Sequence, residues 1–227
     1  MIIATRWTGL ICLLFVALFG VSCDATAAPA HDLPKPADAM PPSKAGETQQ
    51  LVLAGGCFWA TQAVFEKLNG VTKCVAGYAG GSKDTASYEQ VSEGNTGHAE
   101  SVEITFDPTK ISYGELLRVY FTLFDPTTLN RQGNDVGTNY RSTIFYANDE
   151  QKKIAVDYIA QLNAARIFSD PIVTTLEPLK GFYPAEEYHQ DYAEKNPNQS
   201  YVQYCDVPKL KLLHEKFADL LKPTTQP

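Results

Sequence analysis

Cys57 is the residue whose type and position most directly suggest chemistry. It follows two glycines and a short apolar run at residues 51–54, and it opens a segment whose apolar residues recur with helical spacing. Backbone N–H groups at a helix N-terminus favour negative charge and lower the pKa of a thiol below its usual value of about 8.5. We therefore expect Cys57 to be a nucleophilic thiolate, with a small buried core cysteine as the alternative.

Glu100 is the second residue with a chemical interpretation. Residues 101–106 alternate between polar and apolar types, which predicts a half-buried strand, and Glu100 shares the parity of Val102, Ile104 and Phe106. A carboxyl group on the apolar side loses hydration, so its pKa should rise. A glutamic acid that keeps its proton near neutral pH can act as a general acid. The alternative is a solvated Glu100 that precedes the strand.

Two aromatic residues, Phe58 and Trp59, directly follow the cysteine. Adjacent residues point to different sides of a helix, so the two rings cannot fill one core face. At least one ring is therefore expected to be exposed or to line a cavity, where an aromatic wall suits an apolar substrate group such as a methyl sulfide. The alternative for one of the two rings is an ordinary core position.

Three polar residues, Tyr88, Asp135 and Tyr140, lie in segments that we interpret as loops. Asp135 and Tyr140 belong to a long polar loop at residues 125–141, and loops of this length inside a compact domain are often functional. Polar residues on separate loops can converge on one site. Taken singly, each of the three is equally explained as a surface residue.

The elements that must position these residues are short and of both kinds. Apolar runs and alternation predict strands at residues 51–54, 71–78, 101–106, 142–147 and 172–176. Helical spacing predicts helices at residues 57–68, 116–124, 149–166, 186–195 and 209–221. Ser112 and Glu115 have the spacing of a capping box. Because strands and helices alternate irregularly, the pattern favours an α+β domain of two layers.

Composition and charge exclude several classes of function. The chain has 227 residues, of which 44% are hydrophobic, enough for one globular domain plus appendages. The formal net charge is −7, so binding to nucleic acid phosphates, which relies on clustered lysine and arginine, is not expected. The sequence contains no CxxC or HxxxH pair, so we expect no metal. A metal-binding or purely structural exported domain is the weaker alternative.

The first 27 residues have the pattern of an export signal. Arg6 supplies a positive charge, residues 10–21 form an apolar run too short for a spanning helix of about 20 residues, and Ala25-Thr26-Ala27 offers a cleavage site. Val21-Ser22-Cys23 also resembles the end of a bacterial lipoprotein signal. We expect a protein of the periplasm or cell envelope, either soluble or anchored by a lipid on Cys23. An uncleaved N-terminal anchor is the alternative.

Three cysteines remain after removal of this signal unless lipidation retains Cys23: Cys57, Cys74 and Cys205. An odd number in an exported protein argues against a purely structural disulfide framework and indicates a reactive thiol. The rest of the chain is expected to comprise a Pro- and Ala-rich linker at residues 28–50, a folded domain at residues 51–222 and a tail at residues 223–227.

Five stretches together resemble the A-type peptide methionine sulfoxide reductases, and the resemblance runs over residues 51–221. The stretches are Gly56-Cys57-Phe58-Trp59, Gly77-Tyr78-Ala79-Gly80-Gly81, Gly97-His98-Ala99-Glu100, Arg131-Gln132-Gly133-Asn134-Asp135 with Gly137-Thr138-Asn139-Tyr140-Arg141-Ser142, and Tyr188-His189-Gln190-Asp191-Tyr192. This resemblance implies a ferredoxin-like two-layer sandwich with extensions.

The resemblance also implies a reaction. Cys57 would attack the sulfur of a methionine S-sulfoxide, free or within a protein, and Glu100 would protonate its oxygen. Tyr88 and Tyr140 would donate hydrogen bonds to that oxygen, and Asp135 would order the polar side of the site. The products would be methionine and a sulfenic acid on Cys57, without a metal or organic cofactor. Phe58 and Trp59 would hold the substrate methyl group.

A sulfenic acid must be resolved by another thiol. The resemblance implies a resolving cysteine near the C-terminus, and Cys205 is the candidate, although in relatives this residue lies nearer to the position of Val202. Cys74, in a predicted strand, is a less favoured resolver, and direct attack by an external thiol is the third alternative. The implied partners are oxidised proteins and a thioredoxin-like reductant, and we expect a monomer.

A cysteine hydrolase or acyl transferase is the alternative function. This chemistry requires a base oriented beside Cys57, for which His98 and His189 are candidates. His98 follows a glycine in a predicted turn, where a structural or solvated role is favoured. Ester cleavage without sulfoxide reduction would distinguish this function from the reductase.

Overall fold

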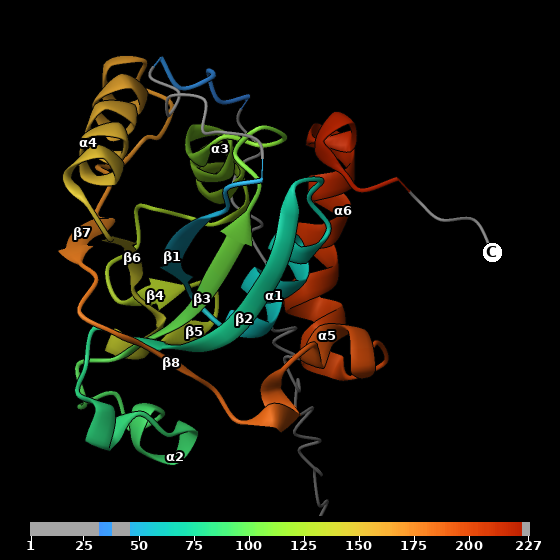
Figure 1. Ribbon diagram of the computed structural model, residues 1–227. Coiled ribbons are helices and arrows are strands. Elements are labelled where there is room, and N and C mark those ends of the chain that lie inside the picture. The colour runs from blue at the N-terminus through green and yellow to red at the C-terminus, as the bar shows by residue number, and fades with distance from the viewer. Residues whose placement is uncertain (1–31, 38–45, 224–227) are drawn as a thin grey trace, which may run out of the picture.

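A six-stranded sheet forms the centre of the protein, as the computed structural model of residues 32–37 and 46–223 shows (Figure 1). Its strand order is β7-β6-β1-β3-β2-β8. The strands are β1 (Gln49–Gly55), β2 (Val71–Ala79), β3 (Ala99–Phe106), β6 (Ser142–Tyr146), β7 (Thr175–Pro178) and β8 (Phe182–Pro184). Neighbouring strands are antiparallel except β6 and β7, which are parallel. The short strands β4 (Arg131–Gln132) and β5 (Asp135–Val136) form a second sheet.

Six α-helices accompany the sheets in the described part of the chain. They are α1 (Phe58–Glu66), α2 (Tyr88–Val91), α3 (Tyr113–Leu123), α4 (Asp149–Ala164), α5 (Tyr192–Lys195) and α6 (Val207–Lys216). Helix α4 lies beside β6 and β7, whereas α6 lies on the opposite side of the molecule, next to α1 (Figure 1). The architecture is a mixed α/β fold with a curled sheet and helices packed on it.

The alternation of β1 and β3 decides which residues enter the main core. Leu51 and Leu53 pack with the helices, and Val102, opposite Leu53, points to the same side. Val52 and Ala54 point to the other face, where they form a smaller cluster. This two-residue period is the reason why the parity of Glu100 could be predicted from the strand alone.

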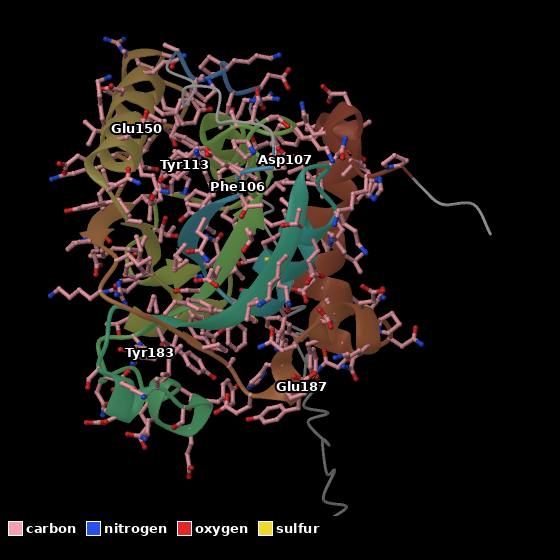
Figure 2. All side chains as sticks on the ribbon, in the orientation of Figure 1. Phe106, Asp107, Tyr113, Glu150, Tyr183 and Glu187 are labelled. Carbon is pink, nitrogen blue, oxygen red and sulfur yellow. The ribbon has the colours of Figure 1, made fainter. Side chains whose placement is uncertain are left out.

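Local capping explains the start of the two longest helices. The Ser112 hydroxyl accepts a hydrogen bond from the Glu115 N–H at 3.1 Å, as the predicted capping box requires, and Asn148 accepts one from Gln151 N–H at 2.9 Å. Figure 2 shows the contrast between the core residue Tyr113 at the start of α3 and Glu150, whose side chain points outward from α4.

The C-terminal part differs from the sequence-based expectation. Residues 186–195 do not form one helix, because Asp191 adopts a left-handed conformation with φ of 56° and separates a 3-10 turn, Glu187–His189, from α5. The predicted strand at residues 172–176 begins later, at Thr175. Strand β8 was not predicted because three residues are too few to display a period.

The described parts of the predicted linker at residues 28–50 are residues 32–37 and 46–50. The prediction of a linker is wrong for Gln49 and Gln50, which belong to β1, and residues 32–37 contact the domain. Leu33 is buried in the main core, and the Pro34 carbonyl accepts a hydrogen bond from the Tyr158 hydroxyl at 3.0 Å. Lys216 donates one to Asp32 at 2.7 Å. The predicted export signal and Cys23 lie outside the described residues. Within the described residues, no helix has the length and apolar character needed to cross a membrane.

Candidate active site

Cys57 lies at the junction of β1 and α1, where it is the N-cap residue of the helix. The preceding Gly56 has a φ of 87°, a value that side chains rarely allow. A Cβ atom at Gly56 would also come within 2.5 Å of the Gln132 Cβ. The glycine therefore permits both the sharp turn into α1 and the close approach of the β4–β5 hairpin to Cys57.

The Glu100 carboxyl lies beside this N-terminus. Its Oε2 accepts a hydrogen bond from the Phe58 N–H at 3.1 Å, and the side chain is only 2% exposed. Burial raises the pKa of Glu100 to about 8, and the charge of Asp135 adds to the rise. Hydrogen bonds from the Phe58 N–H and the Cys57 thiol oppose the shift without cancelling it. The carboxyl is therefore protonated at neutral pH, as the strand parity predicted.

The thiol of Cys57 departs from the sequence-based expectation. Burial raises its pKa well above the usual value, and the negative charges of Glu100 and Asp206 act in the same direction. Hydrogen bonds with the Trp59 backbone N–H and the Tyr201 hydroxyl lower it only in part. The prediction of a thiolate at rest is wrong, because the loss of water outweighs the helical N–H group.

Tyr88, Asp135 and Tyr140 converge on these two groups from separate segments. Tyr88 begins α2, Asp135 begins β5, and Tyr140 ends a 3-10 turn, Thr138–Tyr140. Burial raises the pKa of both tyrosines, and the charges of Glu100 and Cys57 raise it further. Both hydroxyls therefore remain protonated and available as hydrogen-bond donors near the thiol.

The two aromatic residues that follow Cys57 differ in exposure. Phe58 is 1% exposed and packs in the core, whereas Trp59 is half-buried. The Trp59 indole stacks on Tyr192 with ring centroids 3.7 Å apart and an interplanar angle of 11°. Its Nε1 donates a hydrogen bond to His189 Nδ1 at 3.1 Å. The half-buried indole is thus held in a fixed orientation from two sides.

His189 lies within the aromatic cluster. Its ring centroid is 5.0 Å from that of Phe58 and 4.4 Å from that of Tyr88. Because Nδ1 accepts from Trp59, the proton is carried on Nε2, which has no hydrogen-bond partner among the described residues. Burial also lowers the pKa of His189. His189 therefore positions Trp59 and Tyr88 as a neutral ring.

His98 is likewise engaged elsewhere. Its Nδ1 accepts a hydrogen bond from the Gly81 N–H at 3.2 Å, and its Nε2 lies 2.8 Å from the Ser82 carbonyl oxygen. Both ring nitrogens are thus used to hold the backbone of a turn. The structure offers neither histidine as a base oriented on Cys57, so the hydrolase alternative is not favoured.

Tyr201 links the site to the C-terminal segment. Its hydroxyl donates a hydrogen bond to Asp135 Oδ2 at 2.5 Å, and it lies near the thiols of Cys57 and Cys205, where it lowers the pKa of both. Tyr201 stands directly before a π-helical turn, Val202–Asp206, which carries Cys205. A single hydroxyl is therefore bonded to one carboxylate and lies near both thiols.

Cys74 has different surroundings. It is buried on β2, and its charged neighbours are Glu66, Lys222 and Asp191. The three described cysteines are all free thiols. Cys205, rather than Cys74, therefore shares an environment with Cys57.

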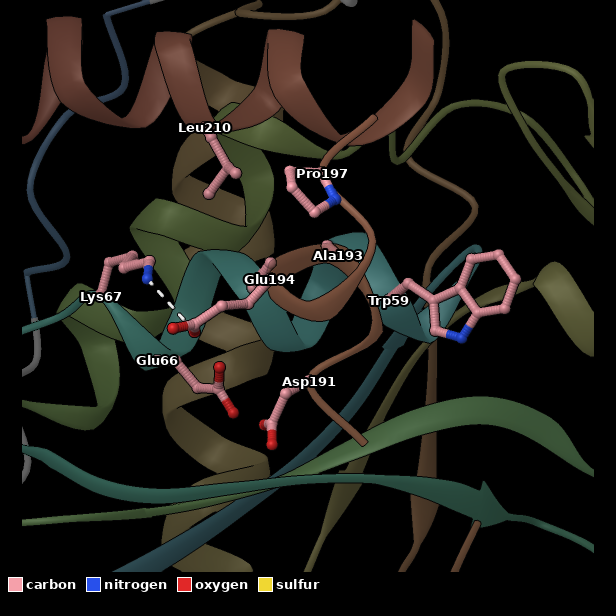
Figure 3. Close-up of a pocket in the computed structure, with 9 residues that line it drawn as sticks. Trp59, Glu66, Lys67, Asp191, Ala193, Glu194, Pro197 and Leu210 are labelled. Atoms are coloured by element: carbon pink, nitrogen blue, oxygen red, sulfur yellow. Dashed lines mark ion pairs between the residues drawn. The ribbon is translucent and has the colours of Figure 1, made fainter. Parts of the chain in front are cut away.

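A cavity of about 270 Å³ lies along α1, and Trp59 forms part of its lining (Figure 3). Its apolar lining includes Ala63 and Leu210, and its polar end holds the carboxyls of Glu66 and Asp191, which point toward one another (Figure 3). Burial and the nearby Asp191 charge raise the pKa of Glu66 to about 7. In the described ranges, no group of three or more His, Cys, Asp or Glu side chains could hold a metal ion.

Two residues of this site, Tyr201 and Asp206, were not predicted from the sequence. His189 and Tyr192 belong to a stretch that carries the family resemblance, but His189 was expected only as an alternative base and neither was expected to hold Trp59. Tyr201 and Asp206 lie close in sequence to Cys205, and the predicted role of Cys205 was the only feature of the sequence that drew attention to this segment. Their roles depend on contacts with α1 and β5 that no periodicity encodes.

Comparison with known proteins decides the family. The family model described as peptide methionine sulfoxide reductase matches residues 49–221. The chain belongs to this family. It is therefore an oxidoreductase that reduces methionine sulfoxide by thiol chemistry.

Curated relatives of the family match most of the domain. Peptide methionine sulfoxide reductase MsrA 2 of Mesorhizobium japonicum is 55% identical over 174 residues, which cover 76% of this chain and 89% of the relative. MsrA 2 of Synechocystis is 48% identical over 176 residues, covering 77% and 82%.

Solved structures of the family share the fold. Reduced Mxr1 of Saccharomyces cerevisiae is 32% identical with a TM-score of 0.63, covering 74% of this chain and 96% of that chain. Methionine sulfoxide reductase A of Corynebacterium diphtheriae is 32% identical with a TM-score of 0.59, covering 76% and 88%.

Proposed function

We propose that Cys57 is the nucleophile and Glu100 the acid in the reduction of methionine S-sulfoxide, free or within proteins. The observation that carries this assignment is the buried carboxyl of Glu100, bonded to the Phe58 N–H and adjacent to the Cys57 thiol. A sulfoxide oxygen is a weak leaving group until it is protonated, and Glu100 holds a proton at neutral pH. The biological role would be the repair of oxidised proteins.

The reaction can be written with all atoms balanced. Glu100 transfers its proton to the sulfoxide oxygen while the Cys57 sulfur bonds to the substrate sulfur, and the thiol proton then passes to the Glu100 carboxylate. The hydroxyl group then moves to the Cys57 sulfur. The substrate sulfur–oxygen bond and the bond between the two sulfurs break, a bond between the Cys57 sulfur and the oxygen forms, and Cys57 is left as a sulfenic acid. The substrate sulfur gains two electrons, Cys57 loses two, and methionine departs.

The residues around Cys57 and Glu100 bind the sulfoxide oxygen and the methyl group of the substrate. Tyr88 and Tyr140 donate hydrogen bonds to the sulfoxide oxygen, since both lie within the electrostatic reach of Cys57 and Glu100. Trp59 holds the substrate methyl group with its exposed face, and the buried ring of Phe58 supports the wall from beneath. Asp135 orders the polar side through its hydrogen bond with Tyr201.

We further propose that Cys205 resolves the sulfenic acid. The Tyr201 hydroxyl lowers the pKa of both thiols and therefore lies near each of them, which supports a short path between them. A thioredoxin-like protein would then reduce the Cys57–Cys205 disulfide by thiol–disulfide exchange. No organic or metal cofactor enters this cycle.

The Cys205→Ser variant tests this assignment. It should release methionine in one turnover at the normal rate, then stop when thioredoxin is the only reductant, because the sulfenic acid persists. Quenched-flow measurement of methionine, followed by thioredoxin-driven turnover, provides the two readouts. Cys57→Ser should lose both activities, and Cys74→Ser should lose neither. Normal thioredoxin-driven turnover of Cys205→Ser would remove Cys205 from the cycle.

The remaining proposals concern fold detail and location. The order β6-β1-β3-β2, with α1 and α3 as connections, supports a ferredoxin-like sandwich as the core, extended by β7 and β8. The N-terminal sequence supports export to the periplasm or cell envelope. The domain is proposed to be monomeric and to begin with β1 at Gln49, with Leu33 from the preceding segment packed into its core. Labelling of the mature protein with a fatty acid tests the anchor at Cys23, and an unlabelled protein would contradict it.

A further inference from the structure

Asp206 is a buried carboxylate that sulfoxide reduction does not use. It is 0% exposed, and within the described residues neither carboxylate oxygen has a hydrogen-bond partner. An ionised carboxylate without partners destabilises a folded protein, so its presence in the core requires an explanation. Glu100 already supplies the acid for the sulfoxide oxygen, so Asp206 is free for another step of the cycle.

A capping role does not explain Asp206. It is the N-cap residue of α6, a position where an aspartate usually accepts a hydrogen bond from an N–H of the first turn. In the described residues its side chain makes no such bond, and Pro208 removes one of the available donors. It also closes the π-helical turn Val202–Asp206, and π-turns are frequent at functional sites.

The charged and titratable neighbours of Asp206 come from several elements. Asp135 on β5 raises the pKa of Asp206, Asp206 raises the pKa of the Cys57 thiol at the start of α1, and Cys205 precedes Asp206 in the same turn. Lys209, on the next turn of α6, is the positive neighbour and donates a hydrogen bond to the Cys205 carbonyl at 2.8 Å. Asp206 thus lies in the electrostatic environment shared by both thiols.

Resolution of the sulfenic acid requires a proton acceptor. The Cys205 sulfur forms a bond with the Cys57 sulfur, the Cys57 sulfur–oxygen bond breaks, and the products are a disulfide and water. Only a thiolate attacks efficiently, so the thiol proton must leave Cys205, and the departing hydroxide must gain a proton. One group that accepts and then returns a proton satisfies both requirements.

We propose that Asp206 is this group: it accepts the proton of Cys205 during attack on the Cys57 sulfenic acid and returns it to the departing hydroxide as water. Lys209 assists by stabilising negative charge on both Cys205 and Asp206. This inference rests on the proposed role of Cys205 as the resolving thiol. The Glu100 carboxylate thus accepts the thiol proton of Cys57 during sulfoxide reduction, whereas Asp206 accepts the thiol proton of Cys205 during disulfide formation.

The pH response follows from the same surroundings. Burial raises the pKa of Asp206 to about 7, Lys209 opposes this rise, and the charge of Asp135 adds to it. As pH rises through about 7, a larger fraction of Asp206 becomes able to accept a proton. Disulfide formation should therefore accelerate over this range in the native protein, with Asp206 as the titrating group.

The Asp206→Asn variant tests the proposal, because asparagine keeps the size of the side chain but cannot accept the proton. Methionine release and Cys57–Cys205 disulfide formation are followed in single turnovers from about pH 5 to about pH 9 by quenched flow and mass spectrometry. We expect the rate of disulfide formation relative to methionine release in the same variant to fall by about 10- to 100-fold, and the rise of disulfide formation near pH 7 to be lost. Native disulfide kinetics in this variant would overturn the proposal.

Two further variants separate the possible failures. Lys209→Gln removes the positive neighbour and should move the midpoint of disulfide formation to higher pH, even if Asp206→Asn does not fold. An unmoved midpoint would contradict the role of Asp206. If the sulfenic acid of Cys205→Ser disappears as rapidly as that of the native protein, Cys205 is not the resolving thiol. If the sulfenic acid persists in Cys205→Ser but Asp206→Asn forms the disulfide at the native rate, Cys205 is the resolving thiol and Asp206 is not its proton acceptor.

Discussion

Glu100 and Cys57 both keep their protons at neutral pH because water is excluded from the junction of β1 and α1. Glu100 in its ionised form further raises the pKa of the thiol, whereas the Cys57 thiol lowers the pKa of Glu100 without cancelling the effect of burial. The site is therefore neutral at rest. A negative charge forms on sulfur only when the sulfoxide oxygen accepts the proton of Glu100, which couples the attack to the proton transfer.

The Glu100→Gln variant tests this coupling. Glutamine keeps the hydrogen-bonding shape but donates no proton, so single-turnover methionine formation should fall by about 10²- to 10⁴-fold. In the native protein, kcat/KM should decline as pH rises through the Glu100 pKa of about 8, because the acid form is lost. The variant should lack this decline.

Glu103→Gln is the matched control, because Glu103 lies on the same strand with a partly exposed side chain. It should leave the rate and its pH profile unchanged. An equal loss in both variants would indicate damage to β3 rather than loss of an acid.

At the scale of elements, the β1–α1 turn determines where the thiol stands. Gly56 lets the backbone turn with a positive φ, and its missing side chain makes room for Gln132 of the β4–β5 hairpin. Gln132 in turn accepts a hydrogen bond from the Asp125 N–H at 3.0 Å. The position of Cys57 therefore depends on two separate segments that meet at one glycine.

Substitution of Gly56 by alanine should damage both stability and activity. A Cβ atom 2.5 Å from the Gln132 Cβ must displace the hairpin or the turn. We expect a loss of about 1–3 kcal/mol in the free energy of unfolding and a slower single turnover. Chemical denaturation and quenched flow measure the two effects.

Gly46→Ala provides the control for backbone strain alone. Gly46 also has a positive φ, of 92°, but a Cβ there would meet no atom within 4 Å of the described protein. Gly46→Ala should lower the free energy of unfolding by about 1 kcal/mol and leave the turnover rate unchanged. Equal effects of the two substitutions would show that the contact with Gln132 is unimportant.

At the scale of the whole molecule, the C-terminal segment completes the site. His189 and Tyr201 lie more than a hundred positions after Cys57 in the sequence, yet both contact Trp59 in the first turn of α1, and Cys205 lies near Tyr201. The same segment places Asp191 against Glu66 on α1, beside the cavity in Figure 3. The docking of this segment thus creates both the active site and a pair of mutually repelling carboxyls.

This pair predicts a pH-dependent stability. The pKa of Glu66 rises from its ordinary value of 4.5 to about 7 in the folded protein, so its unfavourable contribution appears as pH rises from about 4.5 to about 7 and is complete above that range. Glu66→Gln should raise the free energy of unfolding above pH 7 by about 1 kcal/mol, after allowance for solvent screening, and should have no effect in acid. Urea denaturation at several pH values measures this.

The exposed Glu215 on α6 offers a control for the removal of one negative charge. Glu215→Gln should change stability little at any pH. A pH-independent gain in Glu66→Gln would contradict the burial of its charge next to Asp191.

The chemistry-bearing residues of β1, α1 and β3 could be predicted because they depend on local rules. A period of two determines that Glu100 faces the core, and a strand followed by glycines and a helical pattern determines that Cys57 caps α1. The capping box at Ser112 is equally local. The sequence therefore determined the reaction class through these residues and the family motifs that contain them.

Tertiary structure alone decided the protonation states and the contacts of the C-terminal segment. The pKa of Cys57 is raised rather than lowered because distant residues exclude water from the thiol and place carboxyls nearby, an effect that a helix N-terminus in isolation does not reveal. Tyr201 and Asp206 became part of the site only when the π-helical turn packed against α1. Position within a helix or strand is a local property, whereas burial and charge depend on the whole folded chain.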